Sequence, residues 1–199
     1  MQFINRPEIE SQLLAQNHSQ DHYKIREILQ KAKELKGINK NEVLTLLSAT
    51  DPQLCQEIFD TAAWAKNEIY GNRLVLFAPL YISNLCENEC LYCAFRAANK
   101  KLARKALRQD EVAAETQALI EQGHKRVLLV AGESYGQKGL EYVLESINTI
   151  YSVHLPVGNI RRINVNIAPL TLDEFKILKQ QPIGTYQLFQ ETYHQPTYE

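Results

Sequence analysis

The sequence has few of the features that mark several large classes of protein. Only four of its 199 residues are cysteine, which is too few for a disulfide-stabilised scaffold. Neither sign of charge dominates, because 22 lysine and arginine residues face 23 aspartate and glutamate residues and give a formal net charge of −1. This balance gives no electrostatic reason to expect nucleic acid or an anionic membrane as a partner.

Long apolar runs are also missing. No stretch approaches the about 18 residues of a membrane span, and the first ten residues lack the apolar segment of a signal peptide. We therefore expect a cytoplasmic protein with no membrane insertion. With 45% hydrophobic and 23% charged residues, the composition is that of a globular protein and excludes a disordered chain.

The N-terminal third predicts helices, and we expect residues 1–72 to form a helical segment. Apolar residues recur at helical spacing over 21–36 and again along a helix that begins at Asp51-Pro52 and stops at Gly71. Cys55 lies in the second of these helices. We interpret it as a buried, inert thiol, with a ligand or catalytic role as the alternative.

From residue 73 onward the pattern alternates between strand and helix. We expect strands at 73–83, 126–131, 161–168 and 185–190, and helices at 110–122, 138–151 and 171–180. Such alternation predicts an α/β fold of βα units with a parallel sheet. A complete eight-unit barrel takes about 250 residues, so residues 73–199 accommodate about four units. We therefore expect the N-terminal half of an α/β barrel, in a chain that is truncated.

Two of the expected strands differ in pattern. Residues 73–83 are almost continuously apolar, which predicts a strand buried on both faces. Residues 161–168 alternate, with isoleucine and valine on one face and Asn164 and Asn166 on the other. The asparagines would either face inward, toward a barrel lumen or crevice, or only bond to neighbouring strands.

The other three cysteines, Cys86, Cys90 and Cys93, fall in CENECLYC directly after the first expected strand. Thiolates with this C-x3-C-x2-C spacing can converge on one metal centre. A structural zinc site needs four ligands, and a disulfide would leave one thiol unpaired. A 4Fe–4S cluster normally takes four thiolates, so three would leave one iron open to a small-molecule ligand. We favour the cluster; zinc with a distant histidine and unliganded cysteines are the alternatives.

Other candidate residues carry weaker signals. Gly132-Glu133 and Glu191 follow or end expected strands, where barrel active sites gather, although each alone is also typical of an ordinary strand end or a surface carboxylate. The basic run Lys100–Arg108 could bind a partner or phosphate, but we interpret it as a solvated helix start. His194 follows the last expected strand and could border a site.

The cysteine spacing resembles the signature of the radical S-adenosylmethionine (SAM) superfamily. The segments LVLFAPLYISNLCENECLYCAFR, VLLVAGES, RRINVNIAPLTLDEF and GTYQLFQETYH extend this resemblance to the aromatic amino acid lyases. Within that group, about 130 residues from Tyr70 onward resemble the tyrosine lyase of FeFe-hydrogenase maturation. The tyrosine lyase of thiazole biosynthesis, 2-iminoacetate synthase, shares the cysteine motif and the QETYH element.

The resemblance implies a site and a reaction. The three cysteines would hold a 4Fe–4S cluster, and SAM would chelate the fourth iron. Reductive cleavage of SAM would yield methionine and a 5′-deoxyadenosyl radical. The radical would take hydrogen from the amino group of L-tyrosine, and the Cα–Cβ bond would break to give p-cresol and dehydroglycine, the precursor of carbon monoxide and cyanide.

The resemblance also implies SAM contacts. Tyr92 would pack near the adenine, Gly132 would let the backbone approach the methionyl group, and Glu133 would accept from its ammonium group. Gln190 and Glu191 are two further SAM-contacting positions. It assigns no catalytic residue and no tyrosine-binding residue to this chain.

The implied partners are L-tyrosine, a reductant such as ferredoxin or flavodoxin, and other hydrogenase maturation proteins. The maturase that the chain resembles has a second half of the barrel and a C-terminal domain with another iron–sulfur cluster. We therefore expect no p-cresol from this chain alone, and a non-catalytic cluster-binding fragment is the alternative function. The unpaired last strand predicts aggregation.

Overall fold

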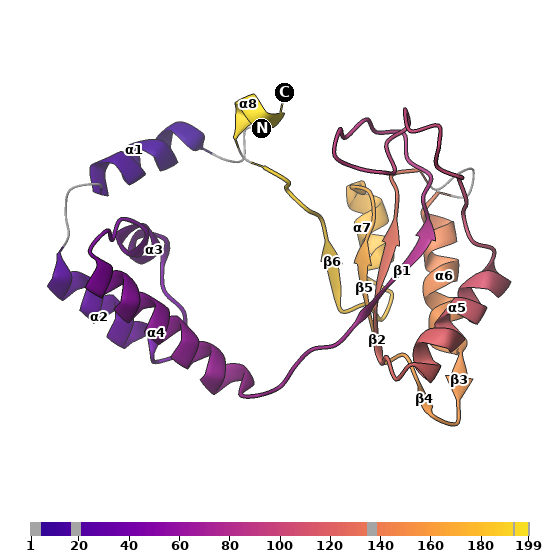
Figure 1. The fold of residues 1–199 in the computed structure, drawn as a ribbon, viewed down its shortest axis with the longest axis horizontal. Coiled ribbons are helices and arrows are strands. Elements are labelled where there is room, and N and C mark those ends of the chain that lie inside the picture. Colours follow the sequence, from indigo (N-terminus) through magenta and orange to yellow (C-terminus); the bar gives the residue numbers. More distant parts are fainter. Residues whose placement is uncertain (1–4, 17–20, 135–138, 193, 199) are drawn as a thin grey trace. The chain divides into compact units, whose positions relative to one another are not determined.

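The computed structural model describes residues 5–16, 21–134, 139–192 and 194–198. The chain divides into two compact units, Met1–Leu74 and Val75–Glu199 (Figure 1), and each is described by itself. In the described residues, no helix combines the length and the apolar character needed to cross a membrane.

The first unit is helical, with α1 (Arg6–Gln16), α2 (His22–Ala32), α3 (Lys40–Leu47) and α4 (Pro52–Tyr70). Asp51 caps α4, since its side chain accepts a hydrogen bond from the N–H of Leu54, and Pro52 occupies the first turn, where no N–H is needed. The helix expected from Asp51-Pro52 to Gly71 is confirmed. The helix expected over 21–36 ends earlier, because Leu35 adopts a left-handed φ of 59°.

A small core joins α2 to α4. Ile25, Leu29 and Leu54 are buried and form one apolar cluster. On the surface beside it, the Arg26 guanidinium donates to both carboxylate oxygens of Glu57, at 2.9 and 2.8 Å. A bidentate pair of this kind fixes the mutual orientation of two helices better than a single contact does.

The second unit alternates strands and helices. Its elements are β1 (Ala78–Ser83), α5 (Gln109–Glu121), β2 (Arg126–Ala131), α6 (Leu140–Ser152), β3 (His154–Leu155), β4 (Gly158–Asn159), β5 (Arg162–Asn166), α7 (Leu172–Leu178), β6 (Thr185–Gln187) and α8 (Gln195–Tyr198). Four parallel strands form a sheet in the order β1-β2-β5-β6, which confirms the α/β class and a partial barrel. The short antiparallel pair β3–β4 was not expected, and the predicted helix start at Lys138 lies outside the described residues.

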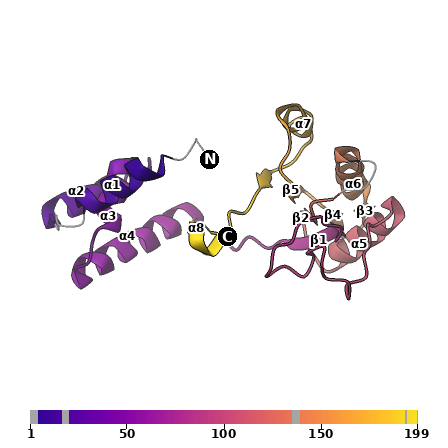
Figure 2. The same cartoon turned by 90° about the horizontal axis from the view of Figure 1, so that it is seen from above.

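Helices α5, α6 and α7 lie on one face of this sheet (Figure 2). One row of side chains on that face crosses all four strands, with Leu80 beside Leu129, Leu129 beside Val165, and Val165 beside Tyr186. The three aliphatic members are buried, and the Tyr186 ring packs edge-on against Phe175 of α7 with ring centroids 5.0 Å apart. The main core therefore lies between the sheet and its helices.

The opposite face of the sheet carries the asparagines. Asn164 and Asn166 are half-buried there, while the isoleucine and valine between and beside them are buried, as the alternation predicts. The side-chain amide of Asn166 donates to the carbonyl of Gln187 at 3.3 Å, and Asn164 accepts from Arg162 at 3.2 Å. The asparagines thus occupy the helix-free face and also bond to their neighbours.

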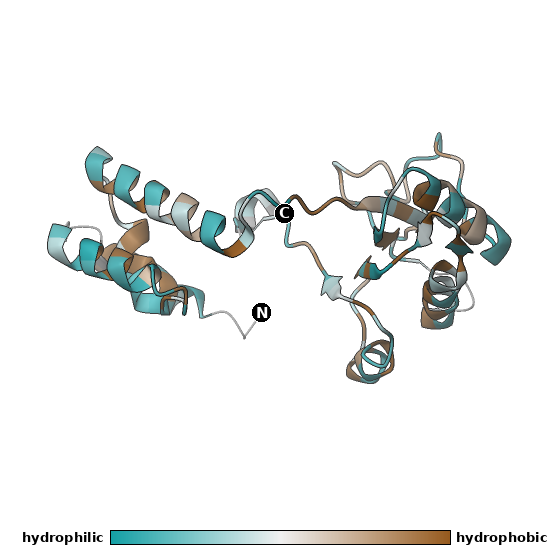
Figure 3. Cartoon of the chain, turned by 90° about the horizontal axis from the view of Figure 1, so that it is seen from below, coloured by the Kyte–Doolittle hydropathy of each residue, from teal (hydrophilic) through white to brown (hydrophobic). Residues whose placement is uncertain are grey.

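Two expected strands are shorter than predicted. The strand expected at 73–83 begins at Ala78, because Ala78 pairs with Val127, and the residues before Val127 soon leave β2 for a turn. It is also not buried on both faces, since helices cover only one of them. The apolar segment 74–77 is exposed, and it is the brown stretch ahead of β1 in Figure 3. β6 likewise stops at Gln187, where its partner β5 ends.

Candidate functional site

The three clustered cysteines lie in the long connection between β1 and α5, residues 84–108, which we call the cysteine loop. It exceeds the about 15 residues that loops without secondary structure seldom exceed, and such loops are usually functional. Its ends are tied together, since the N–H of Asn84 donates to the carbonyl of Lys105 at 3.1 Å and the N–H of Leu107 donates to that of Ile82 at 2.8 Å. The loop therefore projects from the carboxyl end of β1 as a closed unit.

The thiols of the cysteine loop are free and reachable. Cys86 and Cys93 are half-buried and Cys90 is exposed. The N–H of Cys93 donates to the carbonyl of Cys90 at 2.9 Å, and the N–H of Phe95 points at the Cys93 sulfur at 3.4 Å. Cys93 is thus tied to Cys90 and to Phe95 by local contacts.

Three thiols on one loop are a donor set that a 4Fe–4S cluster accepts, since each thiolate of a cluster binds a different iron. In the described residues, no three His, Cys, Asp or Glu side chains are placed to hold one metal ion.

Gly132, which follows β2, lies against the cysteine loop. Its N–H donates to the carbonyl of Ser83 at 3.0 Å. A Cβ added at Gly132 would lie 2.2 Å from the Leu85 carbonyl oxygen and 3.2 Å from the Cβ of Cys86. Only glycine permits this approach, so Gly132 helps to define the backbone path at the first cysteine.

Glu133, the next residue, also contacts the cysteine loop. Its carboxylate accepts a hydrogen bond from the Asn88 side chain at 2.6 Å, and the neighbouring Ser134 hydroxyl donates to Glu87 at 3.2 Å. Burial first and the charge of Glu133 second raise the pKa of Tyr186 on β6. The bonds of Glu133 and Ser134 thus join the end of β2 to the cysteine loop.

Tyr92 and Glu191 lie close to each other at the same end of the sheet. Desolvation, the charge of Glu191 and a hydrogen bond to its carboxylate raise the pKa of Tyr92 to about 12, with smaller contributions from Cys90 and Cys93. Glu191 follows the last strand by four residues instead of ending it. The Gln190 amide is occupied locally, since it donates to the carbonyl of Thr192 at 2.8 Å.

The remaining candidates are His194, Cys55 and the basic run at 100–108. The His194 ring bonds to Thr197 at 2.7 Å. Cys55 is half-buried in the first unit, and its sulfur lies 3.5 Å from the Ala49 carbonyl oxygen. The basic run at 100–108 does not start a helix, because α5 begins at Gln109.

Sequence reasoning missed three polar residues that shape the cysteine loop. The Asn84 side chain accepts a hydrogen bond from the N–H of Lys105 and donates to the Ala103 carbonyl. Asn88 donates to Glu133, and Arg104 donates to several carbonyls of the loop. Asparagine directly after a strand is a turn signal that could have indicated Asn84. Nothing in the sequence distinguishes Arg104 from its basic neighbours.

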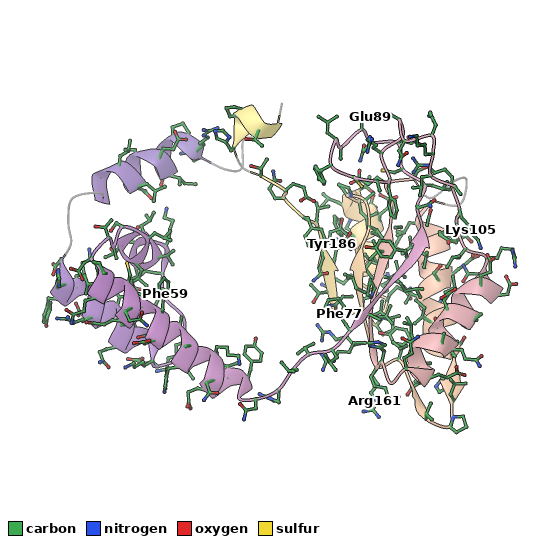
Figure 4. The ribbon with its side chains drawn as sticks, in the orientation of Figure 1. Phe59, Phe77, Glu89, Lys105, Arg161 and Tyr186 are labelled. Atoms are coloured by element: carbon green, nitrogen blue, oxygen red, sulfur yellow. The ribbon has the colours of Figure 1, made fainter. Side chains whose placement is uncertain are left out.

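A cavity of about 460 Å³ lies at the opposite, amino-terminal edge of the sheet. Four basic side chains line part of it, those of Lys125, Arg126, Arg161 and Arg162. Figure 4 labels Arg161 at this edge and Glu89 of the cysteine loop at the other. The candidate site is therefore the carboxyl edge of the strands, where ligands of α/β folds generally bind.

A parallel partial barrel with a three-cysteine loop after its first strand defines the class of protein. The sequence profile of the Radical SAM superfamily matches residues 80–197, and the chain belongs to this superfamily. Superfamily members use a 4Fe–4S cluster together with SAM.

The chain is also similar to particular solved structures and to particular relatives. A crystal structure of HydG, a maturase of the FeFe-hydrogenase, is 47% identical with a TM-score of 0.89, and covers 100% of this chain and 43% of that one. HydG from Carboxydothermus hydrogenoformans is 46% identical with a TM-score of 0.72, and the match covers 89% and 40%. The 2-iminoacetate synthase of Escherichia coli (strain K12) is 30% identical over 172 residues, 85% of this chain and 43% of the relative. The chain thus spans less than half the length of these relatives.

Proposed function

We propose that Cys86, Cys90 and Cys93 hold a 4Fe–4S cluster and that the chain is the N-terminal part of a radical SAM tyrosine lyase. The observation that carries this proposal is the loop of three free cysteines at the carboxyl end of β1, in a chain 47% identical to HydG over its whole length. The bound cluster would supply the electron that cleaves SAM to methionine and a 5′-deoxyadenosyl radical.

The chain's own residues would bind and orient SAM at this edge. Glu133 is exposed, and within the described residues only one of its carboxylate oxygens is bonded, to Asn88, so the other can accept from the ammonium of SAM. Gly132 would leave its backbone open to the methionyl group. Tyr92, paired with Glu191, presents its ring beside Cys93 for stacking on the adenine. Gln190 is a further polar contact.

The substrate proposed for the whole enzyme is L-tyrosine. Loss of hydrogen from its amino group and cleavage of the Cα–Cβ bond would yield p-cresol and dehydroglycine, and dehydroglycine would provide carbon monoxide and cyanide for FeFe-hydrogenase maturation. We further propose a cytoplasmic location, a reductant such as ferredoxin or flavodoxin, and hydrogenase maturation proteins as partners.

Anaerobic reconstitution with iron and sulfide tests the cluster. The parent chain should develop a charge-transfer band at about 400 nm. Cys86→Ala should lose this band, whereas Cys55→Ala is the matched control and should keep it, because Cys55 lies in the other unit. Equal iron binding by parent and Cys86→Ala would contradict the assignment.

The thiazole-biosynthesis tyrosine lyase is a second candidate, favoured by the similarity to 2-iminoacetate synthase, and it forms the same fragments from tyrosine. A cluster-binding fragment without turnover is the other alternative. Reduction of the reconstituted chain with dithionite in the presence of SAM and L-tyrosine tests turnover: we expect no p-cresol, and 5′-deoxyadenosine only if the chain retains SAM cleavage.

A further inference from the structure

The side chain of Arg104 lies within the cysteine loop and is half-buried there. Its Nη1 donates to the carbonyls of Asn84 at 2.8 Å and Phe95 at 2.7 Å. Its Nη2 donates to the carbonyls of Arg96 at 2.6 Å and Asn99 at 3.4 Å. One guanidinium therefore binds four main-chain acceptors from both limbs of the loop.

The chemistry of these contacts requires arginine. The loop has no helix or strand to satisfy its carbonyls, and a carbonyl removed from water without a partner is costly. A guanidinium presents five N–H donors in a fixed planar fork, and it can bridge chain segments that approach from different sides. A lysine ammonium has three donors at a single point and cannot cover the same acceptors at once.

The acceptors flank the cysteine motif at both ends. Asn84 lies two residues before Cys86, and Phe95 lies two residues after Cys93. Phe95 also aims its N–H at the Cys93 sulfur at 3.4 Å, so its position bears directly on that thiol. Arg104 thus ties the chain just before the first cysteine to the chain just after the third.

We propose that Arg104 is a positioning residue of the cysteine centre, whose guanidinium holds Cys86 and Cys93 at the separation that a shared cluster requires. It acts through the backbone, since its four observed acceptors are all main-chain carbonyls. The inference rests on the proposed function, because it takes the cysteines to be the cluster ligands.

Three variants separate the geometry of the Arg104 guanidinium from its charge. Arg104→Gln removes the fork and the charge, Arg104→Lys keeps the charge alone, and Lys101→Gln is the control for charge, because the exposed Lys101 side chain has no partner in the described part of the chain. After anaerobic reconstitution, the rate at which a ferrous chelator removes iron is measured by absorbance at about 400 nm.

Arg104→Gln should release iron about tenfold faster than the parent, as is usual when a residue that orients metal ligands is lost. Arg104→Lys should lie between the two, and Lys101→Gln should match the parent. A parent-like rate in Arg104→Gln, or full rescue by lysine, would overturn the proposal.

A second measurement needs no cluster. In the iron-free chain, each cysteine is labelled with a thiol reagent and quantified by mass spectrometry. Arg104→Gln should speed labelling of Cys86 and Cys93 several-fold while Cys55 labels at the parent rate. Ile150→Ala, which removes core packing near the C-terminal end of α6, is the control for reduced stability and should leave all labelling rates near those of the parent below its melting temperature.

The two measurements distinguish failure of the inference from failure of the proposed function. A parent that binds no iron overturns the proposed function, and with it the positioning role. A parent that binds iron, with labelling equally fast in Arg104→Gln and Ile150→Ala, overturns the positioning role of Arg104 alone, because general loss of stability would then explain the effect.

Discussion

Gly132 shows how one missing Cβ can define a functional loop. The backbone after β2 touches the backbone at Leu85 so closely that any side chain at position 132 would displace the start of the cysteine loop. We suggested from the sequence that glycine gives SAM room to approach. The structure adds a separate reason for glycine, which applies whether or not a ligand is bound.

Gly132→Ala should therefore lower stability and impair cluster assembly together. Forcing a Cβ to within 2.2 Å of the Leu85 oxygen requires the backbone to move, which typically costs about 1–3 kcal/mol. The measurements are urea denaturation and iron content after reconstitution.

The matched control is Gly123→Ala. Gly123 has a positive φ of 94° and nothing near its missing Cβ, so alanine there should also destabilise, but it should leave iron content unchanged. Full iron binding by Gly132→Ala would show that the loop accommodates the displacement.

At the scale of elements, the packing of α2 on α4 depends on very few side chains. Leu54 is fully buried, whereas Phe59, on the same helix and labelled in Figure 4, is 65% exposed. Leu54→Ala should destabilise the first unit by about 2–5 kcal/mol, because it leaves a cavity in a small core. Phe59→Ala is the control and should change the free energy of unfolding little. Urea denaturation followed by far-UV circular dichroism measures both, and similar losses for the two variants would contradict this core assignment.

The ion pair between α2 and α4 predicts a pH dependence. The hydrogen bond from Arg26 lowers the pKa of Glu57 below its ordinary value. A carboxyl whose pKa is lower in the folded state stabilises the fold above its unfolded pKa of about 4.3, and this contribution disappears as the pH falls through the folded value. The effect is small because both partners are partly exposed to solvent.

Glu57→Gln should thus lower the melting temperature at pH 7 and match the parent once the pH lies below the lowered pKa of Glu57 in the folded state, where the parent carboxyl is also uncharged. Glu68→Gln, on the same helix and without an ion pair in the described residues, is the control and should follow the parent throughout. A difference between Glu57→Gln and the parent that is constant with pH would exclude the ion pair as its cause.

The elements differ in how far the sequence could predict them. Asp51 and Pro52 indicate the start of a helix by themselves, and this start is confirmed. The alternation around Asn164 indicates which face of the strand is buried, and this face is also confirmed. Strand ends depend on where the neighbouring strand stops, and for this reason the apolar segment 74–77 was wrongly assigned to a strand.

The residues of the candidate site also divide into those that local sequence indicates and those that only the folded chain reveals. The cysteine motif and Gly132-Glu133 were found because their spacing and their positions after strands are local features of the sequence. Arg104 could not be found in this way. Its acceptors are backbone carbonyls, which every residue carries, and only the folded loop brings them within reach of one side chain.

At the scale of the whole molecule, the sheet of the described residues ends in β1 and β6, and only the carboxyl end of the β1 edge is bridged, where Ser83 meets Ala106 of the cysteine loop. Exposed apolar residues adjoin both edges, among them Leu76, Phe77, Leu188 and Phe189. Unpaired edges beside apolar surface favour association with other chains.

The chain should therefore self-associate as its concentration rises, as measured by light scattering coupled to size exclusion. Replacing Leu76 and Phe189 together with lysine should reduce this association, since charge on an edge opposes pairing. Leu172→Lys is the control, because Leu172 is equally exposed but lies on α7, and it should have little effect. A monodisperse monomer at all concentrations would contradict the expectation from the open edges.

The closed ends of the cysteine loop have a consequence for the order of events during synthesis. Apart from the bond between Tyr92 and Glu191, its hydrogen bonds described above join the loop to residues between Ile82 and Tyr142. The Tyr142 hydroxyl donates to the carbonyls of Ile82 and Leu107. Chains emerge from the ribosome at about 5–20 residues per second, and domains generally form in the order of emergence. The cysteines can therefore take up their arrangement several seconds before β6 exists, and iron can be delivered to a nascent chain whose sheet is still being made.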